Sequence, residues 1–177
     1  MAGLAPNDID TVVLSHAHGD HIGGVTTESV PTFRKARYWF SETEWEHWLQ
    51  PDVIAERPFL AGKLPPLMDY GQVELAEAEV EVAPGVRLLF APGHTPGHMC
   101  IAISAGREMA IYTGDLLHHA AQLDHPQWSP TFDWLPTMSA ASRERILDEA
   151  RREQAVLITA HLPTPGIARP GADGWST

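Results

Sequence analysis

The chain has 177 residues, of which 44% are hydrophobic, and its 12 basic and 23 acidic residues give a formal net charge of −11. This length and composition predict one compact folded domain and exclude a disordered chain. The acidic balance argues against nucleic acid or an anionic membrane surface as a partner.

The sequence shows no targeting or membrane segment. No apolar run reaches the roughly 18 residues that a membrane-spanning helix needs. Met1–Asp8 has neither a basic region nor an apolar core, so we expect no signal peptide. The single cysteine, Cys100, lies in an apolar stretch and is expected to be a small buried residue. These features together predict a cytoplasmic protein.

The first part of the chain is expected to form two short strands and a helix. Pro6–Asp10 is typical of a turn or short helix, and Thr11–Leu14 is an apolar, β-rich run that predicts a buried strand. Arg37–Phe40 is expected to be a second strand. Ser41 and Glu44 match a capping box, in which two side chains satisfy backbone donors at the start of a helix.

The middle of the chain is expected to contain a long loop and then several strands. Pro51–Gly71 is rich in proline and weakly periodic, which predicts a surface loop with some helix that borders a site. Short strands follow, separated by Gly, Pro and polar turns. These are expected at Val80–Ala83, Arg87–Ala91, His98–Ser104 and Met109–Thr113.

The last part of the chain is expected to contain one long helix. Residues 120–136 are irregular and aromatic. An amphipathic helix follows, capped by Ser139 or Ser142 and running to about Gln154. Ala155–Thr159 is then a buried strand, before a tail rich in Gly and Pro. The apolar face of the helix contains Ile146, Leu147 and Ala150.

Four potential metal ligands lie together directly after the first predicted strand. They are His16, His18, Asp20 and His21. Side chains two apart on a strand share a face, so the first two histidines can bind one ion. Gly19 lets the chain leave the strand, which allows the following aspartate and histidine to turn toward a second ion. One strand end is therefore predicted to serve two metals.

Three more potential ligands, His94, Asp115 and His161, each follow a later apolar strand. Ligands gather at the carboxyl ends of strands in layered α/β structures, so four strand ends are expected to bring all seven groups together. A lone histidine is usually a packing residue. Clustered imidazoles and carboxylates, however, cost desolvation and repulsion unless something pairs them. The pattern therefore predicts a site for two divalent metal ions.

Four stretches of the chain resemble the metallo-β-lactamase superfamily. The resemblance covers nearly the whole chain and implies an α/β fold, an αβ/βα sandwich with two bound metals. Those metals are usually zinc, with manganese, iron and cobalt as alternatives. The matching stretches are His-x-His-x-Asp-His at His16–His21, Gly-His-Thr-Pro-Gly-His at Gly93–His98, Gly114-Asp115 and the late His161.

The resemblance also implies how the ligands divide between the two ions, with Asp115 bridging them. One ion is then held by His16, His18 and His94, and the other by Asp20, His21 and His161.

Within the superfamily, the chain resembles the branch of methyl parathion hydrolases and N-acyl-homoserine lactone lactonases. This implies hydrolysis of a lactone or an organophosphate. A glyoxalase II-like thioesterase and a β-lactamase are alternatives, but the best-known β-lactamase subclass has a cysteine where Asp115 stands. The supporting stretches are Ile9–His16, Thr113–His118, His125-Pro126 and Ala160–Pro163.

Members of this family normally carry several strands before the His-rich motif, which begins here at His16. We therefore expect Met1–Thr177 to be a single metallo-β-lactamase-like domain that is shortened at its N-terminus. Part of the sheet would then be uncovered, which favours a homo-oligomer such as a dimer. The alternative to an active hydrolase is a metal-binding, catalytically weak member of such an assembly.

The expected reaction is attack of a metal-bridging hydroxide on the carbonyl carbon or phosphorus of a small-molecule ester, lactone or phosphotriester. Asp115 and Asp20 are the expected catalytic residues, and Asp20 would orient the hydroxide or move its proton. His98 is expected to hydrogen-bond to a ligand without binding metal. His118 and His119 are expected either to line the pocket and protonate a leaving group, or to be ordinary loop histidines.

The remaining histidines and the tryptophans have less specific expectations. His47 and His125 are expected at the surface. Five tryptophans are expected either to form an aromatic wall for the substrate or to pack in the core. They are Trp39, Trp45, Trp48, Trp128 and Trp134.

Overall fold

The computed structural model describes residues 3–177 and divides into two compact units. Unit 1 extends to Glu77, and unit 2 is Ala78–Thr177. Each unit has its own sheet and its own hydrophobic core. The predicted α/β class is confirmed, because both units combine strands with helices. That the chain forms a single domain stays a prediction.

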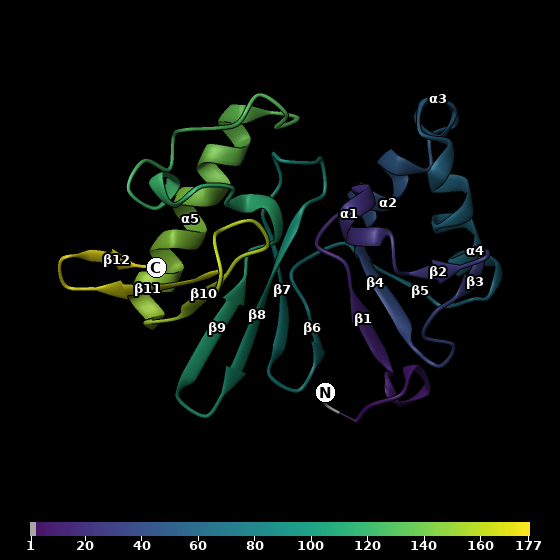
Figure 1. Cartoon of the computed structure of the whole chain (residues 1–177), viewed down its shortest axis with the longest axis horizontal. Coiled ribbons are helices and arrows are strands. Elements are labelled where there is room, and N and C mark those ends of the chain that lie inside the picture. Colours follow the sequence, from purple (N-terminus) through teal and green to yellow (C-terminus); the bar gives the residue numbers. More distant parts are fainter. Residues whose placement is uncertain (1–2) are drawn as a thin grey trace. The chain divides into compact units, whose positions relative to one another are not determined.

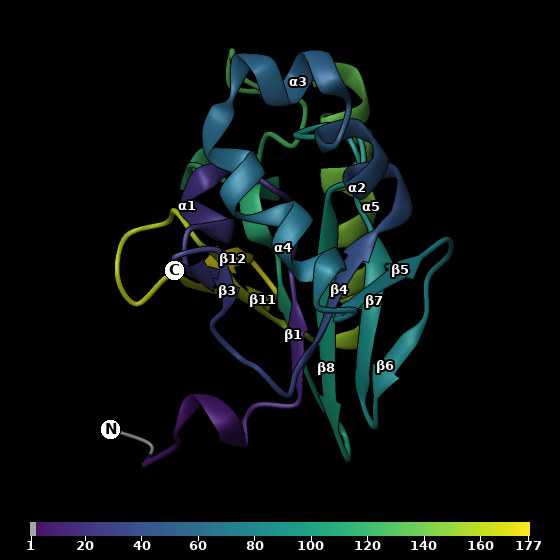
Figure 2. The same ribbon diagram turned by 90° about the vertical axis from the view of Figure 1, so that its right-hand side faces the viewer.

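The sheet of unit 1 has three parallel strands in the order β1–β4–β5 (Figure 2). The first two confirm the expected strands, whereas the sequence pattern does not predict β5. Tyr38 and Phe40 of β4 are fully buried and anchor the core of this unit. The strands of unit 1 are β1 (Thr11–Val13), β2 (Thr26–Thr27), β3 (Val30–Pro31), β4 (Arg37–Ser41) and β5 (Val73–Ala76).

Residues 51–71 are mostly helical, so the expected surface loop with some helix contains more helix than the sequence pattern indicates. Each helix of this segment has a proline in its first turn, where the missing N–H has no intrahelical partner in any case. Leu60 of the second helix and Leu64 and Leu67 of the third are fully buried in the core of unit 1. The helices of unit 1 are η1 (Pro6–Asp8), α1 (Gly19–Ile22), α2 (Glu42–Trp48), α3 (Pro51–Glu56), η2 (Pro58–Gly62) and α4 (Leu64–Asp69).

Unit 2 contains a seven-stranded sheet in the order β12–β11–β10–β9–β8–β7–β6 (Figure 1). Only β9 and β10 pair in parallel among these strands, and the other neighbours are antiparallel. It follows that β7, β9 and β10 run in the same direction and end at the same edge. The strands are β6 (Glu81–Ala83), β7 (Val86–Phe90), β8 (Met99–Ala105), β9 (Glu108–Tyr112), β10 (Val156–Ile158), β11 (Ile167–Gly171) and β12 (Gly174–Ser176).

Helix α5 (Pro136–Glu153) packs on one face of this sheet (Figure 1). The predicted apolar face is confirmed, because Ile146, Leu147 and Ala150 are fully buried among sheet residues. Cys100 belongs to the same core, as expected. Two short helices, η3 (Gly114–Leu116) and η4 (Ala120–Leu123), complete the unit.

The start of α5 differs from expectation. The helix begins at Pro136, whose fixed φ suits a first helical position, so neither Ser139 nor Ser142 is the N-cap. Both serines are buried inside the helix. The tail rich in Gly and Pro pairs as the hairpin β11–β12.

In the part of the chain that the structure describes, no helix combines the length and the apolar character needed to cross a membrane.

Candidate metal site

The predicted ligands of unit 1 lie at the carboxyl end of β1. His16 Nε2 lies 3.1 Å from His18 Nδ1, and the rings of His16 and His21 have centroids 4.1 Å apart. Helix α1 begins at Gly19, so the chain turns there as expected. Asp20 Oδ2 lies 3.4 Å from His21 Nε2. Unit 1 therefore brings its four predicted ligands into one cluster.

A buried carboxylate, that of Glu44, supports the backbone of this cluster. Glu44 is 1% exposed, and its Oε1 accepts hydrogen bonds from the Ala17 N–H at 2.9 Å and from the Trp48 indole at 2.6 Å. Ala17 lies between the first two histidines, so Glu44 fixes the backbone that presents them. The Ser41 half of the expected capping box is confirmed, because its hydroxyl accepts a hydrogen bond from the Glu44 N–H at 3.2 Å.

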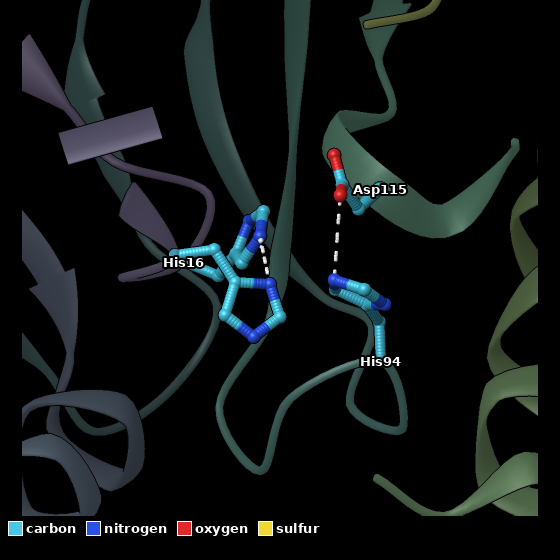
Figure 3. A group of neighbouring side chains, drawn as sticks. His16, His94 and Asp115 are labelled. Atoms are coloured by element: carbon cyan, nitrogen blue, oxygen red, sulfur yellow. Dashed lines mark hydrogen bonds and ion pairs between the residues drawn. The ribbon is translucent and has the colours of Figure 1, made fainter. Parts of the chain in front are cut away.

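The predicted ligands of unit 2 meet at Asp115, which lies in η3 just after β9. The His94 ring points at the Asp115 carboxylate in Figure 3. His94 Nε2 lies 3.3 Å from Asp115 Oδ2, and His161 Nε2 lies 3.1 Å from Asp115 Oδ1. His94 follows β7 and His161 follows β10, so the three strands that end at one edge deliver the three ligands. Each oxygen of the Asp115 carboxylate thus faces a different histidine.

Asp133 is a site residue that the sequence did not indicate. Its side chain is fully buried, and its Oδ1 lies 3.0 Å from His94 Nδ1. Burial lowers the pKa of His94, but its hydrogen bonds with Asp115 and Asp133 outweigh burial and raise this pKa to about 9. Burial raises the pKa of Asp133, but hydrogen bonds with His94 and Ser139 hold this pKa below its ordinary value.

His98 is fully buried and contacts the backbone on both sides of its ring. Its Nε2 accepts a hydrogen bond from the Asp115 N–H at 3.1 Å, so its Nδ1 carries the proton and donates to the Ala91 carbonyl at 3.2 Å. This side chain therefore fixes the backbone of Asp115. The geometry agrees with a supporting role rather than ligation, and that role stays a prediction.

His118 and His119 differ in their contacts. His118 Nε2 lies 3.2 Å from Asp115 Oδ2, and its ring stacks on that of His161 with centroids 5.2 Å apart. His119 caps η4, because its Nδ1 accepts a hydrogen bond from the Ala121 N–H at 3.1 Å. Both histidines line a cavity of about 250 Å³ together with Trp128.

The aromatic residues separate into core and surface groups. Trp45 and Trp48 are each 3% exposed and pack in the core of unit 1. Trp128 and Trp134 are 54% and 55% exposed in unit 2. Packing therefore accounts for the first pair and leaves the second pair at the surface. His125 is exposed and stacks on Trp128, as a surface histidine would.

The donors present suit a divalent transition metal. Imidazole nitrogens and carboxylate oxygens are common ligands of zinc and of other first-row divalent metals. Because each metal–ligand bond is about 2.0–2.2 Å long, two donors that share an ion must lie within a few ångströms of each other. Ligand atoms lie within 4.8 Å of one another in the pairs His16 and His18, Asp20 and His21, His94 and Asp115, and Asp115 and His161. The residues of each unit therefore fit a metal ion.

Known proteins are similar to this chain both in sequence and in fold. Residues 1–161 match the family model of the metallo-beta-lactamase superfamily. The N-acyl homoserine lactonase AiiA of Bacillus thuringiensis subsp. kurstaki is 26% identical over 160 residues, which is 90% of this chain and 58% of that protein. The chain therefore spans less than two thirds of the length of the curated relatives that it matches.

Solved structures give the same picture. AidC, a dizinc quorum-quenching lactonase solved with the product N-hexanoyl-L-homoserine, is 29% identical with a TM-score of 0.77, covering 99% of this chain and 65% of that one. A probable metal-dependent hydrolase from Staphylococcus aureus is 25% identical with a TM-score of 0.84, covering 94% and 60%. These likenesses confirm the predicted fold. Because the family model matches most of its length, the chain belongs to the metallo-β-lactamase superfamily.

Proposed function

We propose that this chain forms a dinuclear metal centre that hydrolyses ester-type bonds, with lactones as the first substrate class. The observation that supports this most directly is the carboxylate of Asp115, which receives a different histidine on each oxygen. A carboxylate placed in this way suits a bridge between two ions. Zinc is the first expectation for both ions, because a related structure at 29% identity is a dizinc enzyme.

The division of ligands in this proposal is the one that the family resemblance implies. His16, His18 and His94 would hold the first ion, and Asp20, His21 and His161 would hold the second. When bound, such a pair of cations polarises the substrate oxygen and activates water as a nucleophile near neutral pH.

The protein side chains supply the rest of the chemistry. Asp115 would be the ligand that both ions share, and His98 fixes its backbone. Asp20 is 61% exposed and can take up the proton that water gives up. His118 contacts Asp115 and lines the neighbouring cavity, which supports a role in giving a proton to a leaving alkoxide.

The surface beside the ligands of unit 2 favours a substrate with an apolar group. Phe132 is 58% exposed, and its ring centroid lies 4.9 Å from that of His118 and 6.0 Å from that of His94. Together with Trp128 it offers apolar area next to the reacting groups. We therefore expect acyl homoserine lactones with longer chains to be better substrates than those with short chains.

The test is a panel of lactone, phosphotriester, thioester and β-lactam substrates, assayed with metal-loaded protein and with Asp115→Ala. Turnover of the lactone that disappears in the variant would support the proposal. Asp148→Ala, which removes an exposed carboxylate of α5, is the matched control and should retain activity. Two bound metals without turnover of any substrate would favour the alternative, a metal-binding but catalytically weak member of an assembly. The dimer expected from the sequence also stays a prediction.

A further inference from the structure

We propose that Asp133 and Arg143 are positioning residues that hold His94 and Asp115 in the geometry that binds metal. Neither residue belongs to the predicted ligand set. The inference rests on the proposed metal centre, because positioning has a consequence only where these two ligands receive an ion.

Asp133 acts on His94 directly. Asp133 Oδ1 lies 3.0 Å from His94 Nδ1, and neither side chain is more than 1% exposed. A carboxylate is an acceptor, so His94 donates its Nδ1–H and leaves Nε2 directed at Asp115. Histidines that bind metal usually have such a partner, which fixes the ring and makes the other nitrogen more basic.

Arg143 connects Asp133 to the loop that carries Asp115. Its side chain is fully buried, and NH2 lies 3.6 Å from Asp133 Oδ2. Its Nε donates to the carbonyl of Leu116, the residue after Asp115, at 2.7 Å. A planar guanidinium can hold two such partners at a fixed distance, which an ammonium group cannot do. One buried side chain from α5 therefore links the supports of both ligands.

The remaining donors of Arg143 are also used. Its NH1 donates to the carbonyls of Pro126 and Trp128 at 2.5 and 3.1 Å, and its NH2 donates to Ser139 Oγ at 3.0 Å. A buried cation held by this many acceptors has one orientation. The guanidinium of Arg143 therefore binds the segment between η4 and α5 as well as Asp133.

The backbone beside His94 is held by the same segment. Trp134 N–H donates to the His94 carbonyl at 3.1 Å, and Leu135 N–H donates to the Gly93 carbonyl at 2.8 Å. Asp133 therefore contacts the His94 side chain, while the next two residues bind the backbone of His94 and of Gly93. This double attachment leaves the imidazole little freedom to turn.

The experiment measures zinc affinity by competition with a chromophoric chelator, using Asp133→Asn and Arg143→Lys in the full chain. Each variant should bind one of its two zinc ions, the more weakly held one, about 10–100-fold less tightly than the unmodified protein binds the corresponding ion. Asp148→Asn, on the exposed side of α5, is the matched control and should bind zinc normally. If both variants bind zinc within about twofold as tightly as the unmodified protein, well short of the expected loss, the inference is overturned.

Two further readouts separate positioning from simple stabilisation. Thermal unfolding of the metal-free variants shows whether they are folded, and the visible spectrum of bound Co²⁺ reports the geometry of the ligands. A changed Co²⁺ spectrum in a folded variant supports positioning, whereas an unchanged spectrum with lower stability contradicts it. If Asp133→Asn does not fold, Arg143→Lys and Ser139→Ala decide the question by the same spectrum.

The outcomes also distinguish this inference from the proposed function. If the unmodified protein binds no zinc, the proposed metal centre is wrong. If it binds two zinc ions and the variants bind them equally well, only the positioning role is wrong.

Discussion

Asp115 has imidazole nitrogens within 3.3 Å of both of its carboxylate oxygens, counting His94, His118 and His161. It is 4% exposed, so water cannot screen these contacts well. A surface aspartate in a loop would have no reason to gather imidazoles in this way. This arrangement suits the shared ligand that the proposed metal centre requires.

The titration of His94 gives a prediction for the metal-free protein. Its pKa is raised from 6.5 to about 9 in the folded chain by Asp115 and Asp133. Charged His94 therefore stabilises the fold fully below pH 6.5, and this contribution is lost as the pH rises through about 9. We expect the free energy of unfolding, measured by urea in the presence of a chelator, to fall across this range.

The variant His94→Gln cannot titrate at this position and is the control for that measurement. Its stability should fall less steeply between pH 6.5 and about 9. An identical pH dependence in both proteins would show that His94 is not the group responsible.

Residue by residue, the ligands were easier to predict than their supports. His16 and Asp115 stand directly after apolar strands, so their positions follow from local pattern. Asp133 lies in an irregular aromatic segment, 39 residues from the histidine that it contacts. A contact of this kind depends on how α5 packs, and no local pattern encodes it.

Glu44 gives a prediction at the level of α2 and the turn that carries His16 and His18. Glu44→Ala removes the acceptor for two buried donors, the Ala17 N–H and the Trp48 indole. Since each unsatisfied donor costs about 1–3 kcal/mol, the free energy of unfolding should fall by at least about 2 kcal/mol. Urea unfolding followed by tryptophan fluorescence measures this change.

Glu46→Ala is the matched control, because Glu46 is an exposed glutamate of the same helix. Its effect should stay within about 0.5 kcal/mol. A loss in Glu44→Ala as small as that of the control would mean that the buried carboxylate does not support the turn.

Gly93 gives a prediction for the junction of the His94 loop with α5. Its φ is +132°, and a Cβ at this position would lie 2.1 Å from the backbone nitrogen of Ser139. Gly93→Ala must therefore displace either the loop or the start of the helix. We expect a loss of thermal stability larger than that of Gly106→Ala, whose φ is +62° but whose Cβ would meet nothing within 4 Å.

The control change alone should cost about 1–2 kcal/mol, the usual penalty for a side chain in the left-handed region. Equal melting temperatures for the two variants would show that the close approach at Gly93 is unimportant.

Elements with a clear apolar pattern were predicted well, and those defined by tertiary packing were not. Thr11–Val13 and Val156–Ile158 are strands because short apolar runs fill a sheet. Residues 51–71 form helices even though their prolines suggest a loop, because each proline falls in a first turn and the leucines between them are buried. The helical spacing of Leu64 and Leu67 was the signal that the proline content obscured.

At the scale of the whole molecule, the chain combines two units that each present a cluster of ligands. Four predicted ligands belong to unit 1 and three to unit 2, so neither unit alone has the full set. The chain spans 58% of the length of the lactonase AiiA, so catalysis by these residues requires a direct test.

The most direct test is a zinc titration of chelator-treated protein, followed by its rate of hydrolysis of an acyl homoserine lactone. We predict negligible turnover without metal, and a rate that rises with added zinc and reaches its plateau at two ions per chain. A chain that binds two zinc ions and never hydrolyses the lactone, or one that hydrolyses it equally well without metal, would contradict a dinuclear lactonase.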